Sequence, residues 1–481
     1  MGAGPAGCVL ATRLARLGRS VLLVERATFP RDRVGESLSP GVAPALAAIE
    51  AGWVLEGAGA ETVGVVRRRW GTSADSRVDA RAEGRVVDRA LFDAALLEHA
   101  RAHGVQVLQP AQITAWHTEA TGEARLQIEA RLGGTPQTVT VHTNAVALAT
   151  GRTGAGARAR GITSHGRRTF ALYAYWKGAH EPSPAIESLR DGWCWGVPIP
   201  GRGYNALAFV DRERLRMARS PEALYHEILA NTALVAPART AVRASRVHVV
   251  EATPQCARVL PPDAGTALVV RVGDAALALD PLSSSGVQKA IQHALASAVV
   301  LNSMLRGGAE RALAWRFHDE QLERAAARHA TATAAHYAAV RDVWPDAPFW
   351  RDRAAGHEGA DGDSRVPKPM PHPEAPLALS PRARVAPVPC LGEADVYLAR
   401  AIVHPEFDAP VAFVSDQPVA DLLARVQHGM SANAIVQQWQ IGLQKGRAIV
   451  RWMLQNGVLQ PAPAEAAAPF PMATMSNGMT A

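Results

Sequence analysis

The chain has 481 residues, enough for two or three domains, and its 48% hydrophobic and 20% charged residues are typical of a globular protein. The formal net charge of +7 suits an anionic ligand such as a dinucleotide, and no single basic run indicates nucleic-acid binding. Cys8, Cys194, Cys256 and Cys390 have no CxxC spacing, which argues against a zinc site or a disulfide scaffold and favours a cytoplasmic setting. Since no run of about 20 apolar residues occurs, we expect no membrane partner. On the cysteine spacing and the charge pattern, we also expect no metal and no nucleic-acid partner.

The first segment has the pattern of a turn, a helix and a strand. Residues 2–7 read Gly-Ala-Gly-Pro-Ala-Gly, and apolar residues at helical spacing follow until Gly18. Residues 21–24 predict a buried parallel strand that ends at Glu25. Glycines let the backbone approach a pyrophosphate, and a ribose hydroxyl can donate to the acidic residue. The segment therefore predicts a dinucleotide site that includes Gly2, Gly4, Gly7 and Glu25.

The strand that precedes such a turn is normally the central strand of its sheet. Here only Met1 precedes Gly2. We therefore expect an in-frame upstream extension that encodes about five or more β-forming residues.

A second constellation indicates a flavin. A buried strand is expected over 268–272, and Gly273-Asp274 follow it directly. Residues 280–287 read Asp-Pro-Leu-Ser-Ser-Ser-Gly-Val and open a helix expected to run to Leu305. The aspartate can bind a ribityl hydroxyl, and N–H groups at the helix start can face the flavin edge that becomes negative on reduction. The alternative is simple N-capping by Asp280. The set expected to bind the cofactor here is Asp274, Pro281, Ser285, Gly286 and Val287.

Composition also suggests the domain organisation. We expect an FAD-binding domain over 1–165 and 255–345, with substrate-side strands also near 60–85, and a substrate domain over 166–254. Residues 354–390 have the Pro-rich composition of a linker, and residues 462–481 that of a disordered tail.

Residues 391–461 predict a small module with helices over 419–426, 432–440 and 447–455. It resembles a winged-helix fold or a small peptide-recognition domain. The middle helix has no Arg or Lys, which disfavours DNA recognition. Two alternatives stay open: the module binds a polypeptide, or it is a cap that only covers the flavoprotein body.

Five motifs within residues 1–300 resemble the flavin-dependent monooxygenase and halogenase superfamily. They are Gly-Ala-Gly-Pro-Ala-Gly at 2–7, Arg-Val-Gly-Glu-Ser-Leu at 33–38, Val-Asp-Arg-Ala-Leu-Phe-Asp at 87–93, Ala-Thr-Gly-Arg at 149–152, and Gly273-Asp274 with the segment 280–287. The resemblance implies an α/β fold in which a Rossmann-type FAD-binding domain is interleaved with a mixed β-sheet substrate domain, plus the helical C-terminal module. It also implies FAD as the cofactor, bound by Glu25, Glu36, Ser37, Arg89, Asp274 and Pro281.

The resemblance implies that reduced flavin and oxygen form a C4a-hydroperoxide. A monooxygenase passes its oxygen to an aromatic substrate, whereas a halogenase passes it to halide and holds the hypohalous acid with a lysine. Residues 192–198 read Gly-Trp-Cys-Trp-Gly-Val-Pro and resemble the halogenase Trp-x-Trp-x-Ile-Pro motif, which makes Trp193 and Trp195 catalytic candidates. The alternative is that both indoles fill the core from one strand face.

The lysine pattern indicates hydroxylation. Halogenases carry their lysine between the Gly-Glu-Ser loop and the Val-Asp-Arg helix, but residues 38–87 contain no lysine, and the arginines at 67–69 are poor proton donors. Lys177 remains a candidate, although an exposed strand lysine is more often a solvated charge. His165 and His180 are candidate acid–base residues, and surface histidines are the simpler interpretation.

We therefore expect an FAD-dependent monooxygenase that hydroxylates an electron-rich aromatic. The chain most resembles tryptophylquinone-maturation flavoproteins, which implies a tryptophan of a partner polypeptide as one candidate substrate. The alternatives are a halogenase of an aromatic substrate, a reductase of isoprenoid double bonds, and an FAD-binding assembly factor without turnover. A separate flavin reductase or NAD(P)H is the expected electron source.

Overall fold

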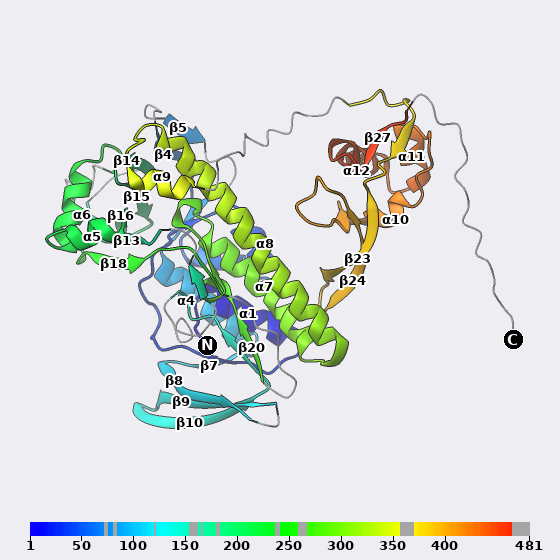
Figure 1. Ribbon diagram of the computed structural model, residues 1–481. Coiled ribbons are helices and arrows are strands. Elements are labelled where there is room, and N and C mark those ends of the chain that lie inside the picture. The colour runs from blue at the N-terminus through cyan, green and yellow to red at the C-terminus, as the bar shows by residue number, and fades with distance from the viewer. Residues whose placement is uncertain are drawn as a thin grey trace. The chain divides into compact units, whose positions relative to one another are not determined.

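The computed structural model describes residues 1–71, 76–79, 84–119, 122–152, 162–164, 167–178, 183–235, 241–257, 267–355 and 370–463 (Figure 1). The chain divides into two compact units. Unit 1 comprises Met1–Asp361 and Leu391–Tyr397, and unit 2 comprises Gly362–Cys390 and Leu398–Ala481. The expected tail at 462–481 lies outside the described residues from residue 464 onward. No helix of the described part is long and apolar enough to cross a membrane.

Unit 1 begins with a parallel sheet that holds the first turn of the chain. Strand β1 (Leu22–Val24) pairs with β7 (Gln106–Leu108), and β11 (Ala145–Leu148) pairs with β20 (Leu268–Arg271), all parallel. The Gly2 N–H donates to the Val24 carbonyl at 2.8 Å, and the Ala149 N–H donates to the Met1 carbonyl at 2.8 Å. Met1 and Gly2 thus join the two strand pairs, and the glycine-rich turn leaves the sheet between them.

Helices cover this sheet and hold its core. They are α1 (Pro5–Arg16), α4 (Arg89–Ala102), α7 (Gly286–Met304) and α8 (Gly308–Arg341), with the short α2 (Val42–Ala47) and α3 (Trp53–Gly57) beside them. The apolar faces of α1, α4 and α7 share one buried cluster, because their apolar residues recur at helical spacing. Helix α4 begins where expected, because the Asp88 carboxylate accepts the Ala90 N–H at 2.8 Å.

An eight-stranded mixed sheet forms the second layer of unit 1. Its order is β17-β13-β16-β15-β14-β4-β5, with β18 also paired to β13. Only β14 and β4 run parallel within this path. The bounds are β4 (Val65–Arg69), β5 (Ser76–Asp79), β13 (Thr169–Lys177), β14 (Ala185–Leu189), β15 (Gly192–Ile199), β16 (Gly203–Asp211), β17 (Val242–Arg243) and β18 (His248–Glu251). This is the mixed substrate-side sheet that the sequence predicted.

Each face of the mixed sheet packs against its own helices. Helix α6 (Pro221–Ala230) joins one apolar cluster, with α5 (Arg212–Met217) beside it, while the C-terminal part of α8 and α9 (Pro348–Ala354) join the other. The cluster that includes α8 and α9 is rich in aromatic rings, among them Trp70, Trp193 and Trp350. Through this cluster β15 packs against the C-terminal end of the long helix α8.

Smaller sheets complete unit 1. One is the antiparallel sheet of β8 (Ala111–Thr118), β9 (Ala124–Leu132) and β10 (Thr135–Thr143). The others are β2 (Ser37–Leu38), β6 (Arg85–Val86) and β3 (Glu61–Thr62), and β12 (Ile162–Ser164), β19 (Gln255–Ala257) and β21 (Leu277–Ala278). Two 3-10 turns, Gly273–Ala275 and Pro281–Ser283, follow β20.

Unit 2 contains the small module. Its helices are α10 (Val419–Leu423), α11 (Ala432–Trp439) and α12 (Leu443–Gln455), around a core that includes Trp439. Its strand pairs are β22 (Leu377–Leu379) with β27 (Leu459–Pro461), β23 (Arg384–Leu391) with β24 (Val396–Val403), and β25 (Phe413–Val414) with β26 (Gln417–Pro418).

Two expectations about this region need correction. Residues 377–379 and 384–390, placed in the linker, form strands. The third helix begins at Leu443 rather than after Gly446, because Gly446 lies inside it where it packs against Val436.

Candidate functional site

A cavity of about 780 Å³ lies within unit 1 and connects the glycine-rich turn with the mixed sheet. Most of the residues that the sequence singled out lie on its wall, although they come from distant parts of the chain. These are Gly2, Gly4, Glu25, Glu36, Ser37, Arg89, Trp193, Trp195, Asp274, Pro281, Gly286 and Val287. The cavity is therefore the candidate active site.

At one end, the first turn is packed too tightly for any residue but glycine. A Cβ on Gly2 would lie 2.5 Å from the Ala149 carbonyl oxygen, and one on Gly7 would lie 1.8 Å from the Gly2 carbonyl oxygen. Gly7 does not line the cavity; it allows the close approach of the backbone within the turn. No side chain caps the N-terminus of α1, so its first N–H groups remain available to a ligand. These features fit a bound diphosphate.

Glu25 lies at the end of β1, as expected, and is nearly fully buried. Its Oε2 accepts the Ala3 N–H at 2.7 Å and its Oε1 accepts the Ala27 N–H at 2.9 Å. These bonds fix the carboxylate beside the turn. Because each carboxylate oxygen has more than one lone pair, it can still accept a ribose hydroxyl.

Five arginines on the cavity wall supply positive charge, namely Arg26, Arg31, Arg33, Arg89 and Arg152. Arg89 is buried and pairs with Asp93 through Nε at 3.0 Å and Nη2 at 3.2 Å, and its Nη1 donates to the Val34 carbonyl at 2.9 Å. The sequence analysis did not single out Arg26 or Arg31, and it quoted Arg33 only as the first residue of the motif at 33–38. Their clustering directly after the strand that ends at Glu25 is the signal that was available.

Glu36 sits on the cavity wall in a buried hydrogen-bond network. Its Oε1 accepts from the Tyr175 hydroxyl at 3.2 Å and from Asn205 Nδ2 at 3.0 Å, while Oε2 accepts the Gly35 N–H at 2.9 Å. Burial raises the pKa of the Glu36 carboxyl above its ordinary value. Tyr175 on β13 and Asn205 on β16 thus tie the mixed sheet to the Gly-Glu-Ser loop.

The turn after β20 places Asp274 on the wall. Its carboxylate contacts Lys289 Nζ at 3.3 Å and Arg152 Nε at 3.7 Å. The Gly273 N–H donates to His293 Nδ1 at 3.1 Å, and His293 stacks on His318 with centroids 5.2 Å apart. Burial lowers the pKa of both histidines, that of His318 to about 4. The turn is therefore anchored on a neutral imidazole.

The segment 280–287 forms a capped 3-10 turn and then the start of helix α7. The Asp280 carboxylate accepts the Leu282 N–H at 3.0 Å, so it caps the 3-10 turn Pro281–Ser283 and not the long helix, and the Tyr337 hydroxyl donates to it at 3.1 Å. Helix α7 starts at Gly286 without a side-chain cap, and Gly286 and Val287 face the cavity. Ser285 does not reach the wall; its hydroxyl contacts Ser283 Oγ at 2.8 Å.

Trp193 and Trp195 lie two residues apart on β15, and both line the cavity. Trp193 is also core, since it stacks on Phe209 with ring centroids 3.8 Å apart and is 2% exposed. Trp195 is half-buried. Both interpretations of the motif therefore hold in part: the two indoles fill the core and also form an apolar wall of the site.

The third catalytic candidate lies elsewhere. Lys177 is exposed at the end of β13 and is not on the cavity wall. His165 and His180 lie outside the described residues. Among the described residues that line the cavity there is no lysine.

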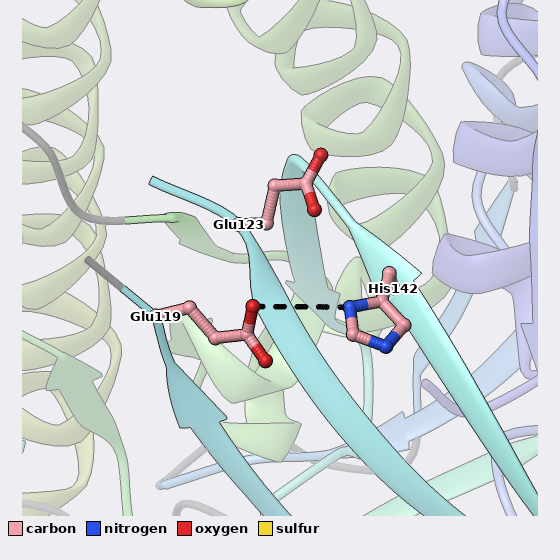
Figure 2. A group of neighbouring side chains, drawn as sticks. All are labelled: Glu119, Glu123 and His142. Atoms are coloured by element: carbon pink, nitrogen blue, oxygen red, sulfur yellow. Dashed lines mark ion pairs between the residues drawn. The ribbon is translucent and has the colours of Figure 1, made fainter. Parts of the chain in front are cut away.

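A separate cluster of potential metal ligands lies on the sheet of β8, β9 and β10. Glu119, Glu123 and His142 offer ligand atoms within 4.8 Å of one another, and Figure 2 shows the Glu119–His142 ion pair at 4.0 Å. Neither glutamate nor the histidine lines the cavity. Sequence spacing did not reveal this group, because strand pairing brings its members together.

Comparisons with known proteins agree with this architecture. The family model described as tryptophan halogenase matches residues 165–366. The chain is 29% identical over 379 residues to the tryptophan 2-halogenase of Chondromyces crocatus, with 74% of this chain and 70% of that protein covered. It is 26% identical over 385 residues to the flavin-dependent halogenase armH1 of Armillaria mellea, with 71% of each covered.

Two solved structures share the fold over nearly the whole chain. The flavin-dependent halogenase CmlS superposes with a TM-score of 0.76 at 22% identity, covering 99% of this chain and 98% of that one. The peptidyl tryptophan dihydroxylase QhpG, described as essential for tryptophylquinone cofactor biogenesis, superposes with a TM-score of 0.71 at 24% identity, covering 95% and 98%. At this identity the likeness concerns the fold.

Proposed function

Because the chain belongs to the flavin-dependent monooxygenase and halogenase superfamily and is an FAD-dependent oxidoreductase, we propose that it halogenates an electron-rich aromatic substrate. This was the alternative in the sequence analysis, and the comparisons favour it over the hydroxylation expected there. Both reactions would use oxygen that the bound flavin activates: a hydroxylase transfers it to the aromatic ring, whereas a halogenase uses it to oxidise the halide that then reacts with the ring.

The observation that carries the proposal is the position of Trp193 and Trp195. They lie in the Trp-x-Trp-x-Val-Pro segment, within the residues that the tryptophan halogenase model matches, and both line the cavity. With Phe209 they form an apolar wall that excludes water and gives an aromatic ring a surface to pack against. The substrate ring would occupy this end of the cavity.

The part of the cavity lined by the glycine-rich turn and the start of α7 would hold FAD, which supplies the two-electron activation of oxygen. Gly2, Gly4 and the start of α1 would face the diphosphate, with Arg31, Arg33 and Arg89 as counter-charges. Glu25 would accept the ribose hydroxyls and Asp274 a ribityl hydroxyl, while the N–H groups at the start of α7 would face the flavin ring. Gly7 would shape the turn, and Glu36 and Ser37 would form the wall beside the flavin.

Hydroxylation is the second candidate, and the lysine pattern favours it. Residues 38–87 contain no lysine, and none lies on the described wall of the cavity. By the resemblance, a halogenase needs such a residue to hold hypohalous acid. The substrate would then be an aromatic ring, with a tryptophan of a partner polypeptide as one form of it, and the unit 2 module would bind that polypeptide.

One experiment separates these functions. The FAD-loaded protein is reduced, mixed with oxygen and an indole or phenol probe, and its products are analysed by mass spectrometry with and without bromide. Halogenation predicts a brominated product that depends on bromide. A hydroxylated product that forms equally without bromide would instead establish the second candidate. Oxygen consumption that yields neither product, and that neither bromide nor a probe stimulates, would count against both functions and favour an assembly role.

The electron source is tested in the same system. We expect reduced flavin to come from a separate reductase, and NAD(P)H is the alternative. The protein alone should then oxidise NADH and NADPH slowly, and an added flavin reductase should restore turnover. Fast oxidation of either nucleotide by the protein alone would show that it carries its own nucleotide site.

A further inference from the structure

A row of four indole rings leads from the cavity wall into unit 1. Trp193 lines the cavity, and its ring centroid lies 6.3 Å from that of Trp70. The Trp70 centroid lies 5.4 Å from that of Trp350, which lies 6.1 Å from that of Trp344. Trp350 is fully buried, and Trp344 is half-buried and so reaches the surface. Each ring therefore contacts the next, from the cavity to the solvent.

The four rings come from four separate segments of the chain. Trp193 lies on β15, Trp70 follows β4, Trp350 lies on α9, and Trp344 precedes α9. The whole chain has 11 tryptophans, so more than a third of them meet in this one row. Filling the core requires only apolar volume, which Leu or Phe supplies without an N–H group to satisfy.

Hydrogen bonds hold the two middle rings in place. The Trp70 indole N–H donates to the His336 carbonyl at 3.0 Å. The Trp350 N–H lies 3.0 Å from the Leu189 carbonyl oxygen and 2.9 Å from that of Arg190. A carbonyl acceptor stabilises positive charge on the indole that donates to it. The two inner positions are thus both rigid and suited to a ring that has lost an electron.

We propose that Trp193, Trp70, Trp350 and Trp344 form an electron-transfer relay that carries one-electron oxidising equivalents from the cavity to the surface. Indole is among the most easily oxidised side chains, and electron transfer between rings slows steeply with separation, so rings in contact exchange electrons fastest. The relay rests on FAD binding in the cavity and not on whether the substrate is halogenated or hydroxylated.

The electron balance is simple. An oxidant in the cavity takes one electron from Trp193, Trp70 then refills Trp193, Trp350 refills Trp70, and Trp344 refills Trp350. Trp344 is left as a radical, its indole proton passes to water, and a thiol in solution returns one hydrogen atom. Oxidised flavin excited by blue light is one such oxidant.

The test is flash photolysis of the FAD-loaded full-length protein, with the tryptophan radical followed by transient absorption. The variant Trp70→Phe interrupts the row with a ring of similar shape that is harder to oxidise, and Trp344→Phe removes its exit. Trp176→Phe is the matched control, because Trp176 is a buried tryptophan whose indole donates to the Tyr225 hydroxyl at 3.0 Å in a different apolar cluster.

The expected result is a long-lived tryptophan radical in the parent protein and in Trp176→Phe. This signal should be lost in Trp70→Phe, because the hole stays on Trp193 and recombines, and should be shortened in Trp344→Phe. If Trp70→Phe does not load flavin, Trp344→Phe decides alone, since its ring is only half-buried and does not line the cavity. A parent protein without a tryptophan radical, or variants with unchanged lifetimes, would overturn the relay.

A second measurement identifies the residue through which the oxidising equivalent leaves the row. Tyr337 lies 5.9 Å from Trp350 between ring centroids and is the competing exit. After illumination without thiol, mass spectrometry should find oxidised Trp344 in the parent protein and oxidised Trp193 in Trp70→Phe. A lifetime shortened by Tyr337→Phe but not by Trp344→Phe would show that the hole leaves through the tyrosine, contrary to the proposal.

Discussion

The hydroxyl of Tyr175 donates a hydrogen bond of 3.2 Å to Oε1 of Glu36, a residue 139 positions earlier in the chain. It joins strand β13 of the mixed sheet to the Gly-Glu-Ser loop on the cavity wall. Asn205 donates to the same oxygen from the neighbouring strand. The loop position therefore depends on the sheet that forms the substrate end.

Replacing Tyr175 by Phe should weaken FAD binding, because Glu36 loses one of its three donors and the loop is held less firmly. A hydrogen bond to a charged group contributes about 2 kcal/mol, so we expect a loss of this order in unfolding free energy as well. Tyr173→Phe is the matched control, since Tyr173 stacks on His248. Equal FAD affinities in fluorescence titrations of the two variants would contradict the role of Glu36.

Substitutions in the turn at residues 2–7 test whether this turn binds the diphosphate of FAD. In Gly7→Ala the new Cβ would lie 1.8 Å from the Gly2 carbonyl oxygen, so the turn must open and FAD should no longer copurify. In Gly52→Ala the new Cβ meets no atom within 4 Å, and the flavin content should remain that of the parent protein. The ratio of flavin to protein absorbance measures both. A yellow, fully loaded Gly7→Ala protein would exclude the turn as the diphosphate site.

The stacked histidines predict an acid-sensitive core. Burial lowers the pKa of His318 from 6.5 to about 4, so the unfolded chain takes up a proton below pH 6.5 that the folded protein does not. The free energy of unfolding is therefore highest above pH 6.5. It falls as the pH drops toward 4, by about 3 kcal/mol from the titration of His318 alone.

His318→Phe should remove that part of the pH dependence. His318 Nε2 has no hydrogen-bond partner within the described part of the chain, so the apolar ring should also stabilise the protein by about 1 kcal/mol or more. Denaturant titrations at pH 7 and pH 5 compare the two proteins, and titrating groups that do not interact with His318 cancel in the difference. A variant that loses stability on acidification as steeply as its parent would show that His318 does not titrate in this window.

Unit 2 can be perturbed by itself. In Gly446→Ala the new Cβ would lie 2.7 Å from Val436 Cγ1, so α11 and α12 must move apart at a cost of about 1–3 kcal/mol. The exposed neighbour Lys445→Ala should have little effect. We expect Gly446→Ala to lower the melting transition of unit 2 while FAD loading persists. Loss of flavin in Gly446→Ala would show that unit 2 supports the flavin site.

Local patterns predicted much of the structure around the glycine-rich turn. The glycine-rich turn, the helix capped by Asp88 and the strand before Gly273 all follow from residues close together in sequence. The Glu36 network did not, because Tyr175 and Asn205 reach it only once the mixed sheet has formed. The four-tryptophan row is invisible in the sequence for the same reason.

Two other differences between the predicted and the observed structure come from single residue types, proline and glycine. Pro387 and Pro389 made their segment look like a linker, yet it forms β23. Within the described residues β23 pairs with β24 in a two-stranded sheet, so both strands are edge strands, where residues without an N–H group are tolerated. Gly446 suggested a helix start, because glycine usually interrupts helices, whereas here it permits close helix packing. A single sequence does not distinguish these uses of proline and glycine.

The bond from the Gly273 N–H to His293 has a thermodynamic consequence for the cofactor. A protonated imidazole nitrogen no longer accepts that N–H, so protonation of His293 and an ordered Gly273–Asp274 turn oppose each other. By reciprocity, the factor by which protonation weakens flavin binding equals the factor by which bound flavin weakens the proton affinity of His293. FAD bound at this turn, as proposed, would therefore keep His293 neutral to a lower pH than in the flavin-free protein.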